Sequence, residues 1–384
     1  MMKRIDYFIP TRIVFGAGRL KELATLSLPG KKALLCVTED KLMEKLGIQQ
    51  RVIELLGQNG VSVAVFDKVT PNPTRTGVMA AAALAKESGC DFVIGLGGGS
   101  SIDTAKAASI MMANPGDLWD YASAGSGGRK PVSGAFPVVA ISTTAGTGTE
   151  ADPYAVVTNE ETNEKLDFTL DEIFPAISII DPEHKLTLFQ GFDALFHASE
   201  CYVNNGNENR LTELFAVDAI EKVAKHLPIV SEDGSNLESR SNISYAANIL
   251  CGFTQSLVCT TSNHIIAQAL GGFFPNVPHG ASLLLIADAY YKKVCSLLPT
   301  EFDAIGEIMG EKADPAKPGY AFVTALAKLM ERTGMDKLAM SGFNINKDDL
   351  PKVAHIAAAE VGFECDRYTV TEADVVEILM QSYK

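Results

Sequence analysis

The stretch that decides the fold is "VIGLGGGSSIDTAKAAS", residues Val93 to Ser109. An apolar run passes into three successive glycines, and a helix-forming segment begins at Ser100 or Ser101. This order predicts a strand, a tight turn and a helix. Ser100 stands where the G-x-G-x-x-G dinucleotide motif has its last glycine, so the motif is incomplete. The segment indicates either a phosphate cradle at a helix N-terminus or a tight strand-to-helix connection without a ligand.

Strand and helix patterns alternate on both sides of this stretch. The runs predicted to be strands are 31–38, 61–69, 91–97, 136–143 and 176–182. The segments predicted to be helices between them are 44–60, 76–89 and 100–114. Repeated strand–helix–strand units with short links predict an α/β fold with a Rossmann-like parallel sheet covered by helices.

The second half of the chain shows only helical patterns. Apolar positions recur at helical spacing in residues 192–203, 210–227, 245–260 and 320–334, and Thr371 with Asp374 forms a capping box before the last helix. We therefore predict an α/β dinucleotide-binding domain over 1–185 and an all-helical metal- and substrate-binding domain over 186–384. The default ligand site is a cleft between the two.

Composition excludes several classes of partner. The 384 residues carry a formal charge of −14 and no basic stripe, which argues against nucleic acid and anionic membranes. No apolar run approaches the about 20 residues that a membrane span needs. The seven cysteines are scattered and never spaced C-x-x-C, so we expect buried thiols, no disulfide scaffold and a cytoplasmic protein.

A second polar turn strengthens the phosphate interpretation of the first. "STTAGTGTEAD", residues 142–152, also follows a predicted strand and combines two glycines with several hydroxyl side chains. Two such turns at the carboxyl ends of strands in one sheet favour a nucleotide crevice.

Histidines and a carboxylate form a second set of candidate residues. Asp193 and His197 are four residues apart on a predicted helix, so both side chains leave the same face. His264 and His279 follow, the latter in the constrained turn "VPHGAS". Each residue alone fits an ordinary structural role, such as a carboxylate–imidazole hydrogen bond. Together they offer one carboxylate and three imidazoles, a good shell for Zn²⁺ or Fe²⁺ with a position left for substrate.

These motifs carry a resemblance to a known family. "VTPNPT", "GLGGGSSIDTAK", "TTAGTGTEAD", "GFDALFHASECY" and "PHGAS", in this order, resemble the iron-containing (group III) alcohol dehydrogenases across nearly the whole chain. The resemblance implies an architecture like that of dehydroquinate synthase, with a nicotinamide cofactor in the α/β domain and a divalent metal. It implies hydride transfer between a small alcohol or aldehyde and NAD, with NADP less favoured, at a substrate oxygen polarised by Fe²⁺ or Zn²⁺. It also implies a homodimer or higher homo-oligomer.

The resemblance assigns residues position by position. Asp193, His197, His264 and His279 fall on the family's metal ligands, and through the metal they are the catalytic set. The residues that fall on or beside its cofactor site are Asn72, Gly97, Gly98, Gly99, Ser100, Asp103, Thr143, Thr144, Thr147 and Lys165. Glu39 follows the first long strand, where the family tends to place an acid that accepts from the NAD ribose. Glu39 could equally be a first-turn acid of the next helix.

The chain departs from the family at three places. Gln268 stands where a histidine often lies four residues after the third metal ligand, so we expect it to position a water or a proton, or merely to pack. The segment from His264 to His279 is one residue longer than usual, and Thr149 replaces a serine. Two alternatives remain: a lyase of the dehydroquinate-synthase type that uses NAD transiently, and a nucleotide-binding relative without catalysis.

Overall fold

The computed structural model of this chain describes residues 7–182, 188–206 and 208–384. The chain divides into two compact units, one formed by Phe8–Leu186 and the other by Met1–Tyr7 with Thr187–Lys384. The boundary predicted at residues 185 and 186 lies outside the described residues, so its position stays a prediction.

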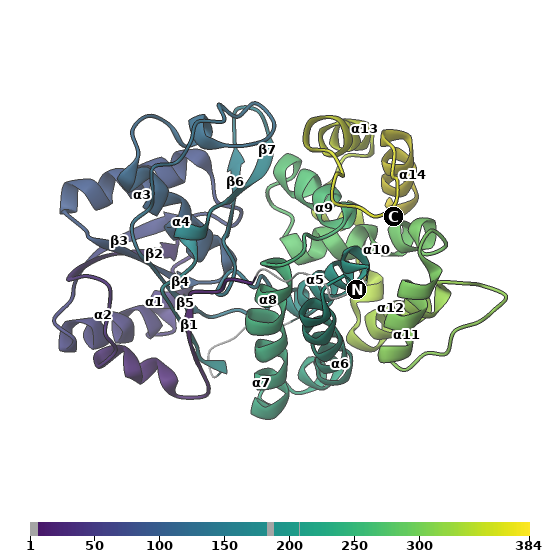
Figure 1. Cartoon of the computed structure of the whole chain (residues 1–384), viewed down its shortest axis with the longest axis horizontal. Helices are drawn as coiled ribbons and strands as arrows, with labels where there is room; N and C mark the ends of the chain where they lie inside the picture. Colours follow the sequence, from purple (N-terminus) through teal and green to yellow (C-terminus); the bar gives the residue numbers. More distant parts are fainter. Residues whose placement is uncertain (1–6, 183–187, 207) are drawn as a thin grey trace. The chain divides into compact units, whose positions relative to one another are not determined.

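The first unit is built on a six-stranded sheet whose strands all run parallel (Figure 1). Its strands are β1 (Arg12–Phe15), β2 (Lys32–Thr38), β3 (Ser62–Val69), β4 (Phe92–Gly97), β5 (Val138–Ser142) and β8 (Ile177–Ile180). Their order across the sheet is β1-β8-β5-β4-β2-β3. Each predicted strand is present, and the α/β class is confirmed.

Helices cover both faces of this sheet, which explains why its four inner strands, β2, β4, β5 and β8, are buried almost throughout. The 3-10 helix Arg19–Ala24 and α2 (Ile48–Gln58) share a buried cluster with Ala33, Leu35 and Val37 of β2. Helices α3 (Arg75–Ser88) and α4 (Gly99–Ala113) pack on the sheet from the opposite side (Figure 1). A short helix α1 (Leu42–Lys45) precedes α2.

The strand order creates a topological switch point between β2 and β4. From β2 the chain passes through α2 to β3 on the outer edge, whereas from β4 it passes through α4 to β5 in the opposite direction. The connections after these neighbouring strands therefore diverge at their carboxyl ends, where doubly wound sheets bind ligands. Glu39 follows β2 and Gly98 follows β4 at this edge.

Several elements of this unit were not predicted, among them β1 and a β-hairpin. Strands β6 (Tyr154–Asn159) and β7 (Glu164–Thr169) form an antiparallel hairpin outside the main sheet. In β7 the buried positions include Glu164 and Lys165, so its sequence lacks the apolar alternation that marks a strand. Glu164 is held instead by hydrogen bonds from Trp119 Nε1 (3.1 Å) and the Ser126 amide (2.6 Å).

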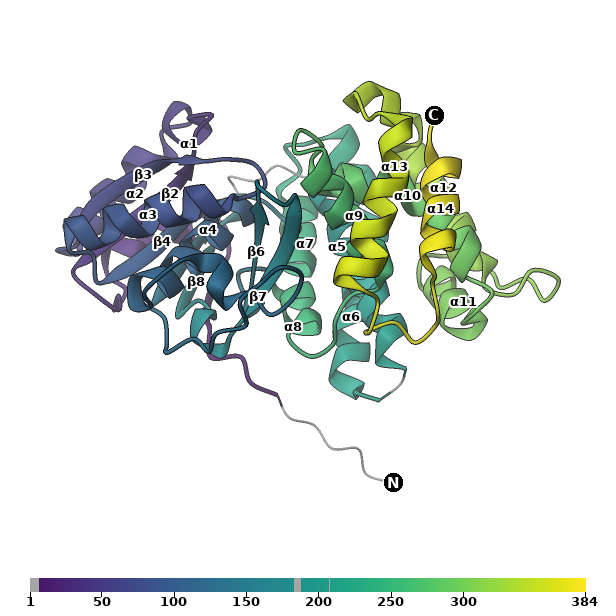
Figure 2. The same ribbon diagram turned by 90° about the horizontal axis from the view of Figure 1, so that it is seen from above.

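The second unit is helical in all its described elements (Figure 2). Its longer helices are α5 (Leu188–Asn205), α6 (Arg210–Glu232), α7 (Leu237–Tyr245), α9 (Ser262–Phe273), α10 (His279–Val294), α11 (Pro299–Ile308), α12 (Tyr320–Thr333) and α14 (Glu372–Ser382), with shorter α8 (Cys251–Gln255) and α13 (Leu350–His355). The helix predicted over 245–260 is shorter: a π-helical turn at Ala246–Leu250 leads into α8, which ends at Gln255.

Aromatic packing around α5 forms the core of the helical unit. Helix α5 contacts α6, α8 and α10, and Phe196 stacks on Tyr291 of α10 with ring centroids 5.8 Å apart. Tyr291 in turn meets Phe322 of α12 edge-to-face at 4.8 Å. The capping box at Thr371 and Asp374 is confirmed at the start of α14. Among the described helices, none is both long and apolar enough to cross a membrane.

The expectation that every cysteine is a buried thiol is wrong for two of the seven. Cys259 and Cys365 form a disulfide, and both lie at the exposed surface. They are 106 residues apart in sequence, so no spacing motif revealed the pair. The five others, Cys36, Cys90, Cys201, Cys251 and Cys295, are free and buried as expected.

Candidate functional site

Helix α5 carries a polar stripe within an apolar environment. Asp193, His197 and Glu200 follow one another at spacings of four and three residues, which places them on one face of the helix. All three are buried, with exposed fractions of 2%, 6% and 1%. A buried polar stripe has to find polar partners, because uncompensated burial costs several kcal/mol.

Helices α9 and α10 supply those partners from their first turns. His264 is the third residue of α9, and His279 is the first residue of α10, after Pro278 as N-cap. The glycine after His279 is required by packing. A Cβ on Gly280 would lie 2.3 Å from the carbonyl oxygen of Phe189 in α5. The motif "PHG" therefore seats the start of α10 directly on the backbone of α5.

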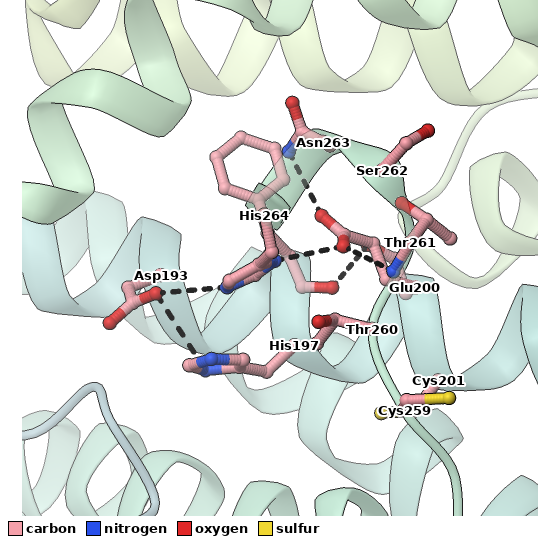
Figure 3. A network of polar contacts seen from close by, with 12 residues as sticks. Asp193, His197, Glu200, Cys201, Cys259, Thr260, Thr261, Ser262, Asn263 and His264 are labelled. Atoms are coloured by element: carbon pink, nitrogen blue, oxygen red, sulfur yellow. Dashed lines mark hydrogen bonds and ion pairs between the residues drawn. The ribbon is translucent and has the colours of Figure 1, made fainter. Parts of the chain in front are cut away.

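Three imidazoles converge on one carboxylate oxygen, and Figure 3 shows two of them, those of His197 and His264. Asp193 Oδ1 lies 3.4 Å from His264 Nε2, 3.6 Å from His279 Nε2 and 3.7 Å from His197 Nδ1. Within the described part of the chain, neither Asp193 Oδ1 nor His264 Nε2 makes a hydrogen bond, although both atoms are buried.

These distances fit atoms that share a cation better than atoms that bond to each other. Two ligands at about 2.0–2.1 Å from one tetrahedral ion lie about 3.4 Å apart. Asp193, His264 and His279 each offer one donor atom, and these atoms lie within 4.8 Å of one another. A carboxylate with imidazoles suits Zn²⁺ or Fe²⁺. The donor set therefore fits a divalent transition metal.

His197 lies beside this group but not inside it. Its ring stacks on that of His264 with centroids 4.4 Å apart, and its Nδ1 faces Asp193. The structure thus brings three of the four predicted ligands into one compact set, and the fourth, His197, packs against this set.

The charges of the cluster reinforce one another. Burial alone would raise the pKa of Asp193, but the imidazoles of His197, His279 and His264 hold its pKa below the usual range. Burial alone would lower the pKa of His264, yet the carboxylates of Glu200 and Asp193 outweigh it and raise the pKa to about 9. Asp193 is therefore ionised at neutral pH.

Sequence reasoning missed the residue behind His264. The imidazole Nδ1 lies 2.8 Å from Glu200 Oε2, on the side of the ring opposite Asp193 (Figure 3). Glu200 also accepts hydrogen bonds from the Thr261 amide (2.9 Å), from Asn263 Nδ2 (2.9 Å) and from the Tyr291 hydroxyl (3.1 Å). Its spacing from Asp193 and His197 on one helix face was the available signal.

The two glycine-bearing turns of the α/β unit lie against each other. Gly97 and Ser142 end neighbouring strands, and the Thr143 amide donates to the Gly97 carbonyl at 2.8 Å. A Cβ on Gly98 would lie 2.9 Å from Thr144 Cγ2. Part of the need for glycine here is thus packing between the turns, not ligand access alone.

The next glycine repeats this arrangement at the start of α4. A Cβ on Gly99 would lie 2.7 Å from Thr147 Cγ2, so the second turn also fills this position. Gly98 is the N-cap of α4, and within the described residues no side chain caps the helix. Gly99 and Ser100 open its first turn, whose amides and positive dipole end suit an anion.

A buried lysine holds the second turn in place. Lys106 Nζ donates to Thr149 Oγ1 (2.8 Å), to Asp152 Oδ1 (3.0 Å), to the Asp152 carbonyl (2.9 Å) and to the Tyr154 carbonyl (2.9 Å). Asp103 accepts from the Thr149 hydroxyl (2.8 Å) and the Val156 amide (3.1 Å). Both Asp103 oxygens therefore bond to protein, and the hydroxyl retained at Thr149 links the two charged residues.

Three further predicted cofactor residues occupy the same unit. Glu39 is exposed just beyond β2, and the neighbouring Asp40 caps the next turn by accepting from the Leu42 amide at 2.9 Å. The capping role is thus filled by Asp40. Asn72 has a left-handed backbone (φ 59°) and accepts from Lys165 Nζ at 2.9 Å. That contact brings two residues 93 positions apart together.

Gln268 lies on α9, four residues after His264 and so on the same helix face. Its side chain is half-buried. This placement agrees with either of the roles expected for it, water positioning or packing.

Two models of one protein family together match nearly the whole chain. Residues 10–182 match the family described as iron-containing alcohol dehydrogenase, and residues 187–383 match the C-terminal domain of the Fe-containing alcohol dehydrogenase family. The chain is 32% identical to an NAD-dependent methanol dehydrogenase of Bacillus methanolicus, covering 97% of this chain and 98% of that protein.

Two further relatives show the same extent of similarity. A 1,3-propanediol dehydrogenase of Citrobacter freundii is 30% identical, with 99% of each chain covered. The crystal structure of an archaeal halo-thermophilic alcohol dehydrogenase from a Red Sea brine pool superposes with a TM-score of 0.92 over 100% of both chains, at 28% identity.

Proposed function

This chain belongs to the iron-containing alcohol dehydrogenase family, and on that premise we propose how its own residues carry the reaction. It is a metal-dependent oxidoreductase of the NAD-linked alcohol dehydrogenase type. We propose that Asp193, His264 and His279 hold the divalent ion and that His197 completes the set by a small movement of its ring. The observation that carries this is the buried Asp193 oxygen, which three imidazole nitrogens face without a hydrogen bond.

The bound ion would act as a Lewis acid that polarises the oxygen of an alcohol or aldehyde. The chain's own contribution is placement. Helix α5 presents Asp193 and His197, while the first turns of α9 and α10 present His264 and His279, so rigid helices hold the donors. Iron agrees with the family description, whereas imidazole donors favour zinc by affinity, so both Fe²⁺ and Zn²⁺ belong to the proposal.

For the cofactor we propose NAD in preference to NADP. Support comes from the switch point between β2 and β4, where the first turn of α4, which no described side chain caps, suits the pyrophosphate and Glu39 suits the ribose 2′-hydroxyl. Thr143, Thr144 and Thr147 would border this site. The Asn72–Lys165 pair would line it, and Asp103 would brace the turns from behind.

The test of the cofactor proposal is a Glu39→Gly variant. Removing the acid should raise turnover with NADPH relative to NADH about tenfold, because a carboxylate repels a 2′-phosphate. Asp40→Asn is the matched control, since Asp40 caps the next turn and should leave the cofactor ratio unchanged. An unaltered ratio in Glu39→Gly would contradict the assignment.

We further propose that Gln268 orients a water that carries the substrate proton, since an amide cannot release a proton itself. A Gln268→His variant followed across pH tests this. The new imidazole should change the pH profile of kcat, because it titrates near neutrality. Identical profiles and rates would leave packing as the role of Gln268.

The substrate we propose is a small, uncharged alcohol or the matching aldehyde, as the names of the methanol and 1,3-propanediol relatives suggest. We also propose a homodimer or higher homo-oligomer, supported by the place of β1 at the edge of the sheet. For a cytoplasmic location the support is the five buried free thiols, whereas the surface disulfide Cys259–Cys365 counts against it. Gel filtration and cell fractionation test these two points.

The deciding experiment measures reduced nicotinamide while the purified protein turns over a panel of short alcohols with NAD⁺ and aldehydes with NADH. Activity should appear with Fe²⁺ or Zn²⁺, disappear on chelation and return on reconstitution. No activity with any member, in protein that carries one metal ion per chain, would favour the lyase or the inactive relative.

A further inference from the structure

We propose that Glu200 is the positioning residue of the metal centre: it acts through His264, fixing which nitrogen of that ring faces the ion and strengthening that nitrogen as a donor. This inference rests on the metal site proposed above. It concerns a buried carboxylate that lies behind the donor set (Figure 3).

The geometry of His264 carries the first step. Its two ring nitrogens face two different carboxylates, with Nδ1 at 2.8 Å from Glu200 Oε2 and Nε2 at 3.4 Å from Asp193 Oδ1. An ionised carboxylate can only accept, so Nδ1 carries the hydrogen of this bond. In the neutral ring the lone pair is then on Nε2, the atom that joins the compact donor set.

The carboxylate itself is held rigidly, which gives the second step. Glu200 is 1% exposed, yet both of its oxygens are satisfied by donors from other helices. Oε2 accepts from the Thr261 amide, while Oε1 accepts from Asn263 and Tyr291. Hydrogen bonds from this many donors favour the charged form of a buried carboxylate and hold it in one orientation.

The same carboxylate also holds the start of α9, the helix that carries His264. Thr261 is the N-cap of α9, and among the described residues no side chain caps the helix in the ordinary way. Instead the Thr261 amide donates to Glu200, and the next amide, that of Ser262, donates to Asp366 at 2.9 Å. Glu200 therefore fixes both the backbone at Thr261 and the ring of His264, three residues further on.

A carboxylate behind a metal-binding imidazole makes the ring more basic, and losing one typically weakens metal binding 10–100-fold. Glu200→Gln keeps the shape and one acceptor but removes the charge, which roughly halves the strength of the bond to Nδ1. We expect Glu200→Gln to bind metal 10–100-fold more weakly than the wild type, with a changed ligand field.

The experiment uses Co²⁺ as a probe of both affinity and geometry in the full-length protein. Competition with a chelator gives the dissociation constant, and the visible absorption bands report the ligand field. Tyr291→Phe is the matched control, because it removes one hydrogen bond to the far oxygen of Glu200 without touching His264. It should keep the wild-type bands and an affinity within about threefold of wild type.

A second readout needs no metal. Histidine ¹⁵N spectra of the metal-free protein should show a protected Nδ1–H on His264 in wild type and Tyr291→Phe, and a less protected one in Glu200→Gln, whose side-chain oxygen is a neutral and weaker acceptor. This signal separates a change at the ring from a general loss of stability, which thermal unfolding of the three proteins reports.

Each outcome decides. Weakened binding with shifted bands in Glu200→Gln alone supports the inference. If Glu200→Gln keeps the wild-type affinity and absorption bands, the inference about Glu200 is overturned and the proposed function is unaffected. Equal weakening of Co²⁺ binding in both variants has the same consequence. If the wild type binds no Co²⁺, the proposed metal site fails first, and the role of Glu200 fails with it.

Discussion

Each unit of this molecule buries a charged cluster, and the two clusters are completed in different ways. In the α/β unit Lys106 is fully buried and donates to four oxygen atoms, so its ammonium group is saturated by protein. In the helical unit Asp193 Oδ1 is equally buried, but three nitrogens stop 3.4–3.7 Å away without bonding to it. We call the first cluster closed, because protein atoms satisfy its buried charge, and the second open, because buried polar atoms in it make no hydrogen bond. A closed cluster supports the fold, whereas an open one indicates a ligand site.

Breaking the closed cluster should have the largest effect on stability. Lys106→Met leaves Asp152 and Asp103 buried without their cation, which costs about 3–5 kcal/mol of unfolding free energy. Urea unfolding measures it. Lys130→Met removes a cation that is 58% exposed and should cost less than about 1 kcal/mol. Equal losses in the two variants would mean that the Lys106 cluster does not stabilise the fold.

Breaking the open cluster should instead affect the ligand. In His279→Ala the affinity for Zn²⁺ should fall at least about 100-fold, more than for a residue behind the ligands. The metal-free protein should lose less than about 1 kcal/mol, because the side chain is 25% exposed. Metal titration and urea unfolding measure the two quantities.

The control for this change is His355→Ala on α13, whose imidazole is 57% exposed and pairs with Glu372. It should alter neither metal affinity nor stability appreciably. Unchanged metal affinity in His279→Ala would remove that residue from the donor set.

The disulfide of the helical unit cross-links two segments that lie next to the open cluster. Cys259 lies two residues before Thr261, whose amide holds Glu200, and it joins the segment just before Asp366. Reducing it should cost about 2–4 kcal/mol of stability, since it closes a long loop. Thermal unfolding with and without a thiol reductant measures this loss.

A Cys259→Ser, Cys365→Ser double variant is the control, since the reductant should no longer change its unfolding. Wild type that is equally stable in both conditions, with the bond shown to be reduced, would contradict the prediction.

The smallest effect concerns pH and the closed cluster. Burial raises the pKa of Asp103 to about 6, although Lys106 and the Thr149 hydroxyl act against it. A folded pKa above the unfolded one means that the folded protein holds the proton more tightly. The stabilising contribution is complete below about pH 4 and is lost as the pH rises through 6.

Wild type should therefore lose about 1–3 kcal/mol relative to Asp103→Asn between pH 4 and pH 6. Unfolding of both proteins at several pH values measures the difference, and any constant cost of the amide cancels. A difference that stays flat over this range would show that Asp103 is already ionised at pH 4.

The sequence by itself determined the strand–helix alternation around Val93–Ser109, the helical second half and the four candidate ligands. These are local signals: apolar periodicity, glycine turns and the four-residue spacing of Asp193 and His197 on one helix. The sequence did not determine the β6–β7 hairpin, because Glu164 and Lys165 fill buried positions there and hide the strand pattern.

Only the tertiary structure decided which residues complete each cluster. It placed Glu200 behind His264 from 64 positions away, joined Cys259 to Cys365 across 106, and bound Lys106 to a turn more than 40 residues later. It also left His197 beside the donor set that the other three ligands form. Partners so distant in sequence meet only when helices and strands pack, and packing of the whole chain leaves no periodic trace in the sequence.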